Sequence, residues 1–325
     1  MEKLKKLFSL MFVATLVFLQ TSCSNVYDEM QSCNDTSSSV EDKNLAVLFN
    51  SLDSLNACYP TSTTRGKFWG GAGTSIADNV GRALGGKIGG RVGGTIGSLT
   101  GNPMGTIGGY IIGAKFGPML CSAIASGFAN MWLSCSVPNS STSSLVVKSD
   151  MAFKSILDEK DAVLGRDHNI VMGKILTNPN RYGYGIKIDE SKLYDDIVEN
   201  CKKLGYSDST YSSPEQKEKI IKAVRVIYEP LLKFEKQEID EREFIEKYVE
   251  ILTLRYRMDE RAVNVFRNFT CKIAFKCAQL NEEQIHSYSE DLCKTIKESS
   301  IQEVNKIMIA NSAQLVINST LCWQQ

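Results

Sequence analysis

The sequence predicts an all-α protein in which a long helical hairpin is joined to a C-terminal multi-helix domain and preceded by a disordered N-terminal tether. Two patterns in the 325 residues carry this prediction. Every fourth position from residue 73 to residue 117 is glycine except Ala77, and from Asp150 on an apolar period of 3.6 residues appears among charged residues. Outside a short stretch from Tyr182 to Ile188, no strand pattern competes with the helical periods.

Residues 1–22 form a signal peptide, because lysines at the start precede an apolar stretch, residues 7–19, that is too short to span a bilayer. The following "TSC", which ends at Cys23, resembles the lipobox of bacterial lipoproteins, with Gln20 where leucine is common. The resemblance implies cleavage before Cys23, acylation of its thiol by chains such as palmitate, and an outer-membrane anchor at the cell surface. An ordinary signal peptide with an incidental cysteine is the alternative.

Residues 23–65 are expected to form a lipid-anchored tether or propeptide. The composition is mostly polar, and only residues 45–59 have the spacing of one short amphipathic helix. The tether ends in "PTSTTRG", a polar joint in which Arg65 precedes Gly66.

Residues 66–135 contain the glycine register, in which one residue falls on the same face of a helix at each turn. Collagen requires a period of three, and a phosphate-binding loop requires a single short glycine cluster, so neither explains the register. A helix with bare backbone on one face allows another helix to approach closely, which is most favourable in lipid. The register consists of Gly73, Ala77, Gly81, Gly85, Gly89, Gly93, Gly97, Gly101, Gly105, Gly109, Gly113 and Gly117.

Pro103 is expected to divide this region into two arms. The first arm, residues 73–101, carries polar and basic residues on one face. The second arm, residues 104–135, has Lys115 as its single charged residue and several bulky apolar residues, which makes it the better candidate for membrane insertion. Residues 66–118 contain five basic residues and a single acidic one, so an anionic envelope lipid is the expected partner.

The register resembles a glycine zipper, and together with the basic residues and "KFWGG" it resembles class II-type bacteriocins. A lipobox joined to such a zipper resembles the secreted lipoprotein toxins of Bacteroidales, which a clostripain-like protease cleaves after arginine. The resemblance covers about residues 1–135. It implies an activating cut between Arg65 and Gly66, although an ordinary exposed arginine is the alternative, and self-association through the zipper.

Residues 136–149 form a Ser/Thr-rich linker, and residues 150–325 are expected to fold as an α-helical domain. Ser213 followed by Pro214 indicates a helix start. Asp167 in "GRDHN" is interpreted as a helix cap rather than a catalytic group. The spacing of Val263, Phe266, Phe269 and Ile273 predicts core positions. The expected helices lie near 150–163, 167–177, 188–204, 213–236, 239–256, 259–279, 282–297 and 299–318.

Composition argues against several functional classes. The formal net charge is zero, so nucleic acid is not an expected partner. The ten cysteines form no C-x-x-C pair and histidines number two, so no metal site or other cofactor is expected. No nucleophile and base occur together in a recognisable motif, so the chain is not expected to be an enzyme.

The sequence therefore predicts an antibacterial toxin, a surface lipoprotein whose cationic zipper region permeabilises a target bacterial membrane, with cleavage at Arg65 as the activating step. The alternative is a structural outer-membrane lipoprotein that packs its zipper in the producer's own envelope and uses the helical domain as a binding module.

Overall fold

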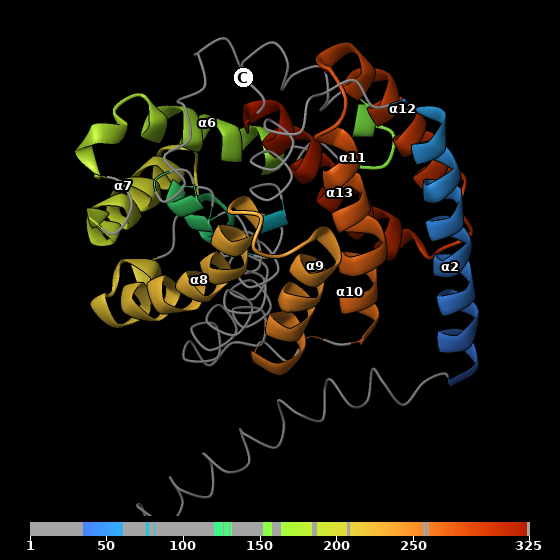
Figure 1. Ribbon diagram of the computed structural model, residues 1–325, viewed down its shortest axis with the longest axis horizontal. Coiled ribbons are helices and arrows are strands. Elements are labelled where there is room, and N and C mark those ends of the chain that lie inside the picture. The colour runs from blue at the N-terminus through green and yellow to red at the C-terminus, as the bar shows by residue number, and fades with distance from the viewer. Residues whose placement is uncertain are drawn as a thin grey trace, which may run out of the picture. The chain divides into compact units, whose positions relative to one another are not determined.

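The computed structural model describes part of the chain, and every regular element in that part is a helix (Figure 1). The all-α prediction is therefore confirmed for these residues. The chain divides into two compact units, residues 1–46 and 47–325, and nearly all of the described helices belong to the second unit. The described residues are 35–60, 76–77, 81, 120–125, 127–129, 131, 152–157, 164–183, 187–206, 209–255, 258 and 260–323.

The helices follow the predicted order with shifted ends. Among the elements of the structure, α6 packs on α7 and α8 packs on α9. The α-helices are α2 (Asp35–Cys58), α6 (Leu164–Leu176), α7 (Glu190–Lys203), α8 (Pro214–Glu235), α9 (Glu241–Glu250), α10 (Glu260–Val265), α11 (Cys271–Cys277), α12 (Glu282–Glu298) and α13 (Glu303–Trp323). The 3-10 helices are η1 (Pro179–Arg181) and η3 (Ser209–Ser212), and the π-helices are η4 (Ile251–Arg255) and η5 (Phe266–Thr270).

Three sequence predictions need correction in this part of the chain. The tether is helical over Asp35–Cys58, so the prediction of disorder is wrong there, and the helix predicted near residues 45–59 is confirmed and longer. The helix predicted for 150–163 is reduced to residues 152–153 followed by a turn in the described residues. The helix predicted for 259–279 contains the π-turn η5, which changes the helical register between α10 and α11.

Side-chain caps fix several helix starts, as the sequence around Ser213 predicts. The Ser213 hydroxyl accepts a hydrogen bond from the backbone N–H of Gln216, and Pro214 occupies the first turn, where its missing N–H costs nothing. At the start of α12, Asn281 and Gln284 form a reciprocal capping box. Local sequence therefore determines where α8 and α12 begin.

The last helix, α13, lies in the core even though polar residues such as Ser312, Gln314 and Asn318 are interspersed with its buried apolar ones. Its residues from Ile309 to Leu321 are buried apart from a half-buried Asn311. It packs against α6, α11 and α12. The C-terminal domain is thus arranged around one buried helix rather than around paired hairpins alone.

An aromatic cluster forms the second part of the core, between α8, α9 and α11. The rings of Phe234 and Phe244 stack with centroids 4.2 Å apart, and Phe275 and Tyr248 meet this pair edge-on. The predicted core positions Val263, Phe266, Phe269 and Ile273 are all buried. The periodicity of this region therefore identified its buried face correctly.

We expect Phe244→Ala to lower the free energy of unfolding of the helical domain by about 3–5 kcal/mol, because it leaves a cavity opposite Phe234. Asn281→Ala, which removes a surface cap, should lower it by about 1 kcal/mol. Denaturant unfolding followed by circular dichroism measures both. Equal effects of the two substitutions would show that the aromatic cluster is not a principal support of the domain.

Candidate functional site

The described residues of the second arm are buried inside the helical domain. Residues 120–125, 127–129 and 131, called here the buried segment, have helical backbone (sea green in Figure 1). Its side chains are at most 1% exposed. Leu120, Ile124, Phe128 and Met131 fall on one helical face, and burial of each contributes about 2 kcal/mol. A segment that the sequence predicts for a membrane is therefore covered here by protein.

A second face of the buried segment consists of small residues and meets the glycine register. A Cβ at Gly81 would lie 2.6 Å from the backbone oxygen of Cys121 and 2.9 Å from the Cβ of Ala125. These distances leave no room for any side chain larger than hydrogen at position 81. Ala77, one turn earlier in the same register, is also fully buried. The glycine face at Gly81 therefore packs against a small-residue face of the same chain, as in close helix pairs of the small-xxx-small type.

Helices α7 and α8 contact the buried segment through Leu193, Ile197 and Tyr228, which we call the cradle. A Cβ at Gly127 would lie 3.3 Å from Ile197 Cδ1 and 3.5 Å from both methyl carbons of Leu193. The rings of Phe128 and Tyr228 have centroids 5.8 Å apart.

One directional contact fixes the segment in the cradle. The buried Tyr228 hydroxyl donates a hydrogen bond of 3.0 Å to the backbone oxygen of Ala125. By contrast, the Ser122 hydroxyl is buried and has no hydrogen-bond partner among the described residues. An unpaired buried hydroxyl costs about 1–3 kcal/mol. The hydrogen bond at Ala125 therefore stabilises the packing of the segment, and the hydroxyl of Ser122 destabilises it.

The "GRDHN" stretch lies in α6 and contacts α13 and the end of α7. The helix begins before Asp167, so the interpretation of this residue as the cap is wrong: its carboxylate accepts hydrogen bonds from Tyr206 and Arg166. The Asn169 side chain joins His168 to the backbone of Asn318, with both contacts at 2.9 Å. The buried Asn169 contact joins α6 to α13, and the part-buried Asp167 contact joins α6 to the residues that follow α7, which explains why this motif is not a surface loop.

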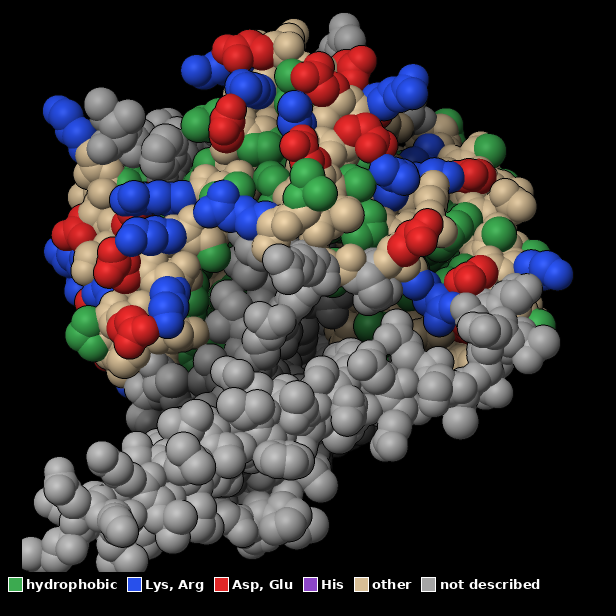
Figure 2. Space-filling model, turned by 90° about the horizontal axis from the view of Figure 1, so that it is seen from below, with side chains coloured by type: hydrophobic (Ala, Val, Ile, Leu, Met, Phe, Trp, Pro, Cys, Tyr) green, Lys and Arg blue, Asp and Glu red, His purple; other side chains and the backbone are tan. Residues whose placement is uncertain are grey.

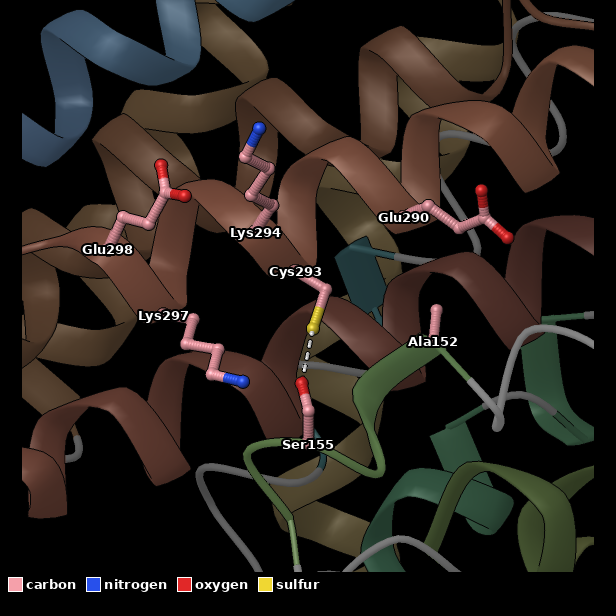
Figure 3. Close-up of a pocket in the computed structure, with 7 residues that line it drawn as sticks. All are labelled: Ala152, Ser155, Glu290, Cys293, Lys294, Lys297 and Glu298. Carbon is pink, nitrogen blue, oxygen red and sulfur yellow. Dashed lines mark hydrogen bonds between the residues drawn. The ribbon is translucent and has the colours of Figure 1, made fainter.

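A separate groove lies between α12 and residues 152–155 and has a volume of about 580 Å³. Figure 3 shows Cys293 at the centre of the groove, directed toward Ser155, and the Cys293 Sγ and Ser155 Oγ atoms are 3.6 Å apart. Burial raises the pKa of the Cys293 thiol, so the thiol is protonated at neutral pH and is not an activated nucleophile. Glu290 and Glu298 lie at opposite ends of the groove and do not converge on the sulfur (Figure 3).

Charges on the described surface are mixed. Figure 2 shows basic and acidic side chains interspersed over the face seen from below. Several form exposed pairs along one helix, such as Lys219 with Glu215 and Lys233 with Glu229, which contribute little to stability. On this face the helical domain therefore has no broad patch of one sign, and the cationic character predicted from the sequence belongs to residues 66–118.

Most of the predicted functional residues lie outside the described part of the chain. Of the register, the structure describes Ala77 and Gly81. No described helix is both long enough and apolar enough to cross a membrane, and no cluster of metal-binding side chains occurs among the described residues. The predicted functional residues that lie outside the described part of the chain are Cys23, Arg65, Gly66, Gly73, Gly85, Gly89, Gly93, Gly97, Gly101, Gly105, Gly109, Gly113 and Gly117, together with ranges 1–22 and 136–149.

The described cysteines carry free thiols, namely Cys58, Cys121, Cys201, Cys271, Cys277 and Cys293. Comparison of the chain with models of protein families, with curated proteins and with solved structures finds no significant match.

We expect Gly81→Ala to destabilise the packing of the buried segment by about 1–3 kcal/mol, because the added methyl meets backbone rather than a movable side chain. Gly173→Ala is the matched control: it lies in α6, and its added Cβ would have nothing within 4 Å. This control should gain about 0.5–1 kcal/mol. Hydrogen exchange of residues 120–131 and thermal unfolding measure both effects. Unchanged exchange in Gly81→Ala would refute the close contact.

Cys121 reports on the same contact chemically. Burial raises the pKa of its thiol to about 12, so about one molecule in 10⁴ carries a thiolate at pH 8 even before access is considered. Cys58 is exposed. At pH 8 we expect a maleimide to label Cys58 within minutes and Cys121 only when the buried segment leaves the cradle, as measured by peptide mass spectrometry. Equal labelling rates in the folded protein would contradict the burial.

Proposed function

We propose that this protein is a surface-exported lipoprotein toxin with antibacterial activity, in which the helical domain stores a membrane-active glycine-zipper hairpin in a latent form. The hairpin inserts into the anionic membrane of a target bacterium and permeabilises it. Cleavage after Arg65 frees the N-terminal end of the hairpin for this step. The protein catalyses no reaction and uses no cofactor or metal.

The observation that carries the proposal is the burial of the described residues 120–125, 127–129 and 131, which contact Gly81 of the register and the cradle. A segment this apolar requires either protein or lipid around it, because exposing it to water loses the hydrophobic stabilisation of several large side chains. Lipid also shields these side chains from water. In lipid a glycine-rich backbone is favoured as a helix, because its N–H and C=O groups must bond to one another within the segment. The same residues therefore suit both a stored and an inserted state.

Stored and inserted states must be close in free energy for release to occur. The unpaired Ser122 hydroxyl lowers the stability of the stored state, while the Tyr228 hydrogen bond raises it. A conformation held by a few kcal/mol is shifted by a partner that favours the alternative. An anionic bilayer, attracting the five basic residues of 66–118, is that partner.

The test is leakage of dye from anionic vesicles, together with killing of sensitive cells, by the purified protein intact or cut after Arg65. We expect the cut protein to do both. Gly89→Leu with Gly93→Leu should abolish leakage while leaving export normal, because leucine fills the zipper groove. Absence of both leakage and killing refutes the toxin, and an effect of gene deletion confined to the producer's envelope favours the structural role.

Two cradle variants should change leakage in opposite directions. Tyr228→Phe leaves the Ala125 carbonyl without its donor and should speed leakage about tenfold or more, since 1.4 kcal/mol corresponds to a factor of ten. Ser122→Ala removes the unpaired hydroxyl and should slow leakage by a similar factor.

The control for these variants is Tyr248→Phe. The Tyr248 hydroxyl donates to the backbone oxygen of Ile227 at 2.7 Å, which is the same kind of hydrogen bond but made to α8 itself, beside Tyr228, and not to the buried segment. This variant should lower overall stability without a matching rise in leakage. If all three substitutions change leakage in proportion to overall stability, the cradle has no special role in storage.

A further inference from the structure

The stretch that precedes the proposed cleavage joint is fastened to the helical domain. We call residues 47–60, the end of α2 and the two residues after it, the strap. On its inner side Leu48 and Leu52 are at most 1% exposed, and Phe49 is 8% exposed. The strap therefore has an apolar face of its own, packed within the second compact unit of the chain.

Polar contacts hold the same face along its length on α11 and α12. The Asp53 carboxylate pairs with Lys272 Nζ at 2.7 and 2.8 Å. One turn later, the Tyr288 hydroxyl donates to Asn56 Oδ1 at 2.8 Å. The Tyr288 side chain is buried, so this bond lies inside the contact rather than at its rim.

The densest contacts lie at the last two residues of the strap. The Tyr59 ring meets the Tyr288 ring edge-on with centroids 5.3 Å apart, and its hydroxyl donates to Asp291 at 2.7 Å. Lys276 donates to the backbone oxygen of Tyr59, and Gln284 donates to the backbone oxygen of Pro60 at 3.4 Å. Desolvation by burial and the bond to Asp291 both raise the pKa of Tyr59, so its hydroxyl remains a donor at physiological pH.

These contacts end five residues before Arg65, on the N-terminal side of the proposed cut. Hydrolysis there adds water across one peptide bond and leaves a carboxylate on Arg65 and an ammonium group on Gly66. The described contacts of the strap lie upstream of that bond, with partners on α11 and α12 far downstream. Cleavage therefore removes a covalent link and leaves the strap contacts in place.

We propose that the strap holds the N-terminal fragment on the helical domain after cleavage, so that activation gives a two-chain complex that keeps the lipid anchor rather than a free C-terminal toxin. This inference rests on the proposed function for the location of the cut, and on the contacts of residues 47–60 for the association. The consequence is a toxin whose hairpin is released for insertion while its helical domain stays at the surface where the anchor lies.

The test uses the full mature chain with Cys23→Ser, which removes the acylation site so that membranes play no part. An affinity tag is placed at the N-terminus, and a specific protease recognition sequence replaces residues 61–64. After complete cutting, the tagged fragment is captured, and the C-terminal fragment is measured on the resin and by native mass spectrometry. We expect at least nine-tenths of the C-terminal fragment to stay bound for hours. Its appearance in the first wash overturns the proposal.

Matched variants locate the association in the strap. Tyr59→Phe removes the bond to Asp291 and should speed separation of the fragments several-fold, and Leu52→Asp with Lys272→Ala should speed it a hundredfold or more. Lys219→Ala, which breaks an exposed pair with Glu215 on α8, should leave the rate unchanged. Equal separation rates in all variants overturn the proposal, and circular dichroism before cutting confirms that each variant is folded.

The outcome is independent of the toxin's activity. Retention of the fragment without vesicle leakage would refute the proposed function and support the strap. Separation of the fragments with full leakage would refute the strap and support the proposed function.

Discussion

The side chains of the buried segment expose almost nothing to water, and α7 and α8 contribute to covering them. An apolar helix with small residues on one face and large ones on another requires two kinds of neighbour. The glycine register supplies the close one at Gly81, where backbone meets backbone, and the cradle supplies the bulky one around Phe128. The buried polar contacts of α6 with α13 and the aromatic cluster between α8 and α9 then fix the helices that bear the cradle.

Storage and activity use the same chemistry in this account. The features that suit the segment to lipid, which are few charges, small residues in register and a glycine face, also suit it to a dry protein interior. In the proposed function, the helical domain therefore takes the place of lipid around the buried segment. In that proposal the hold is moderate, because the buried Ser122 hydroxyl has no hydrogen-bond partner among the described residues while the Tyr228 hydroxyl bonds to Ala125.

The sequence predicted the helical class and most helix positions, because a 3.6-residue period records which face is buried. It also located the Ser213 cap, which depends on neighbouring residues alone. It missed α2 over residues 35–44, where polar composition hides the helix, and it missed the π-turn η5, whose extra residue has no clear compositional mark. The Asp167 interpretation failed because its partner Tyr206 lies 39 residues away, beyond the reach of local rules.

The location of the second arm illustrates a deeper limit of sequence reasoning. The hydrophobicity of a segment indicates that it is buried away from water. It does not indicate whether protein or lipid surrounds the segment. The small residues Cys121, Ala125 and Ala129 recur at every fourth position, which is the spacing of the glycine register that Cys121 and Ala125 contact at Gly81. This matching spacing could have predicted that the second arm packs against protein. Two complementary registers in one chain indicate an internal pair before they indicate a pair between chains.

A reversible lock between the buried segment and the cradle tests the central claim most directly. The Leu193 side chain is directed toward position 127, with its methyl carbons 3.5 Å from a Cβ built there, so Gly127→Cys with Leu193→Cys is the pair of thiols chosen for a disulfide. With the disulfide confirmed by peptide mass spectrometry, the oxidised protein should not leak dye from anionic vesicles, and a reductant should restore leakage. Equal leakage before and after reduction would show that the segment does not need to leave the cradle, and would contradict storage of a latent hairpin.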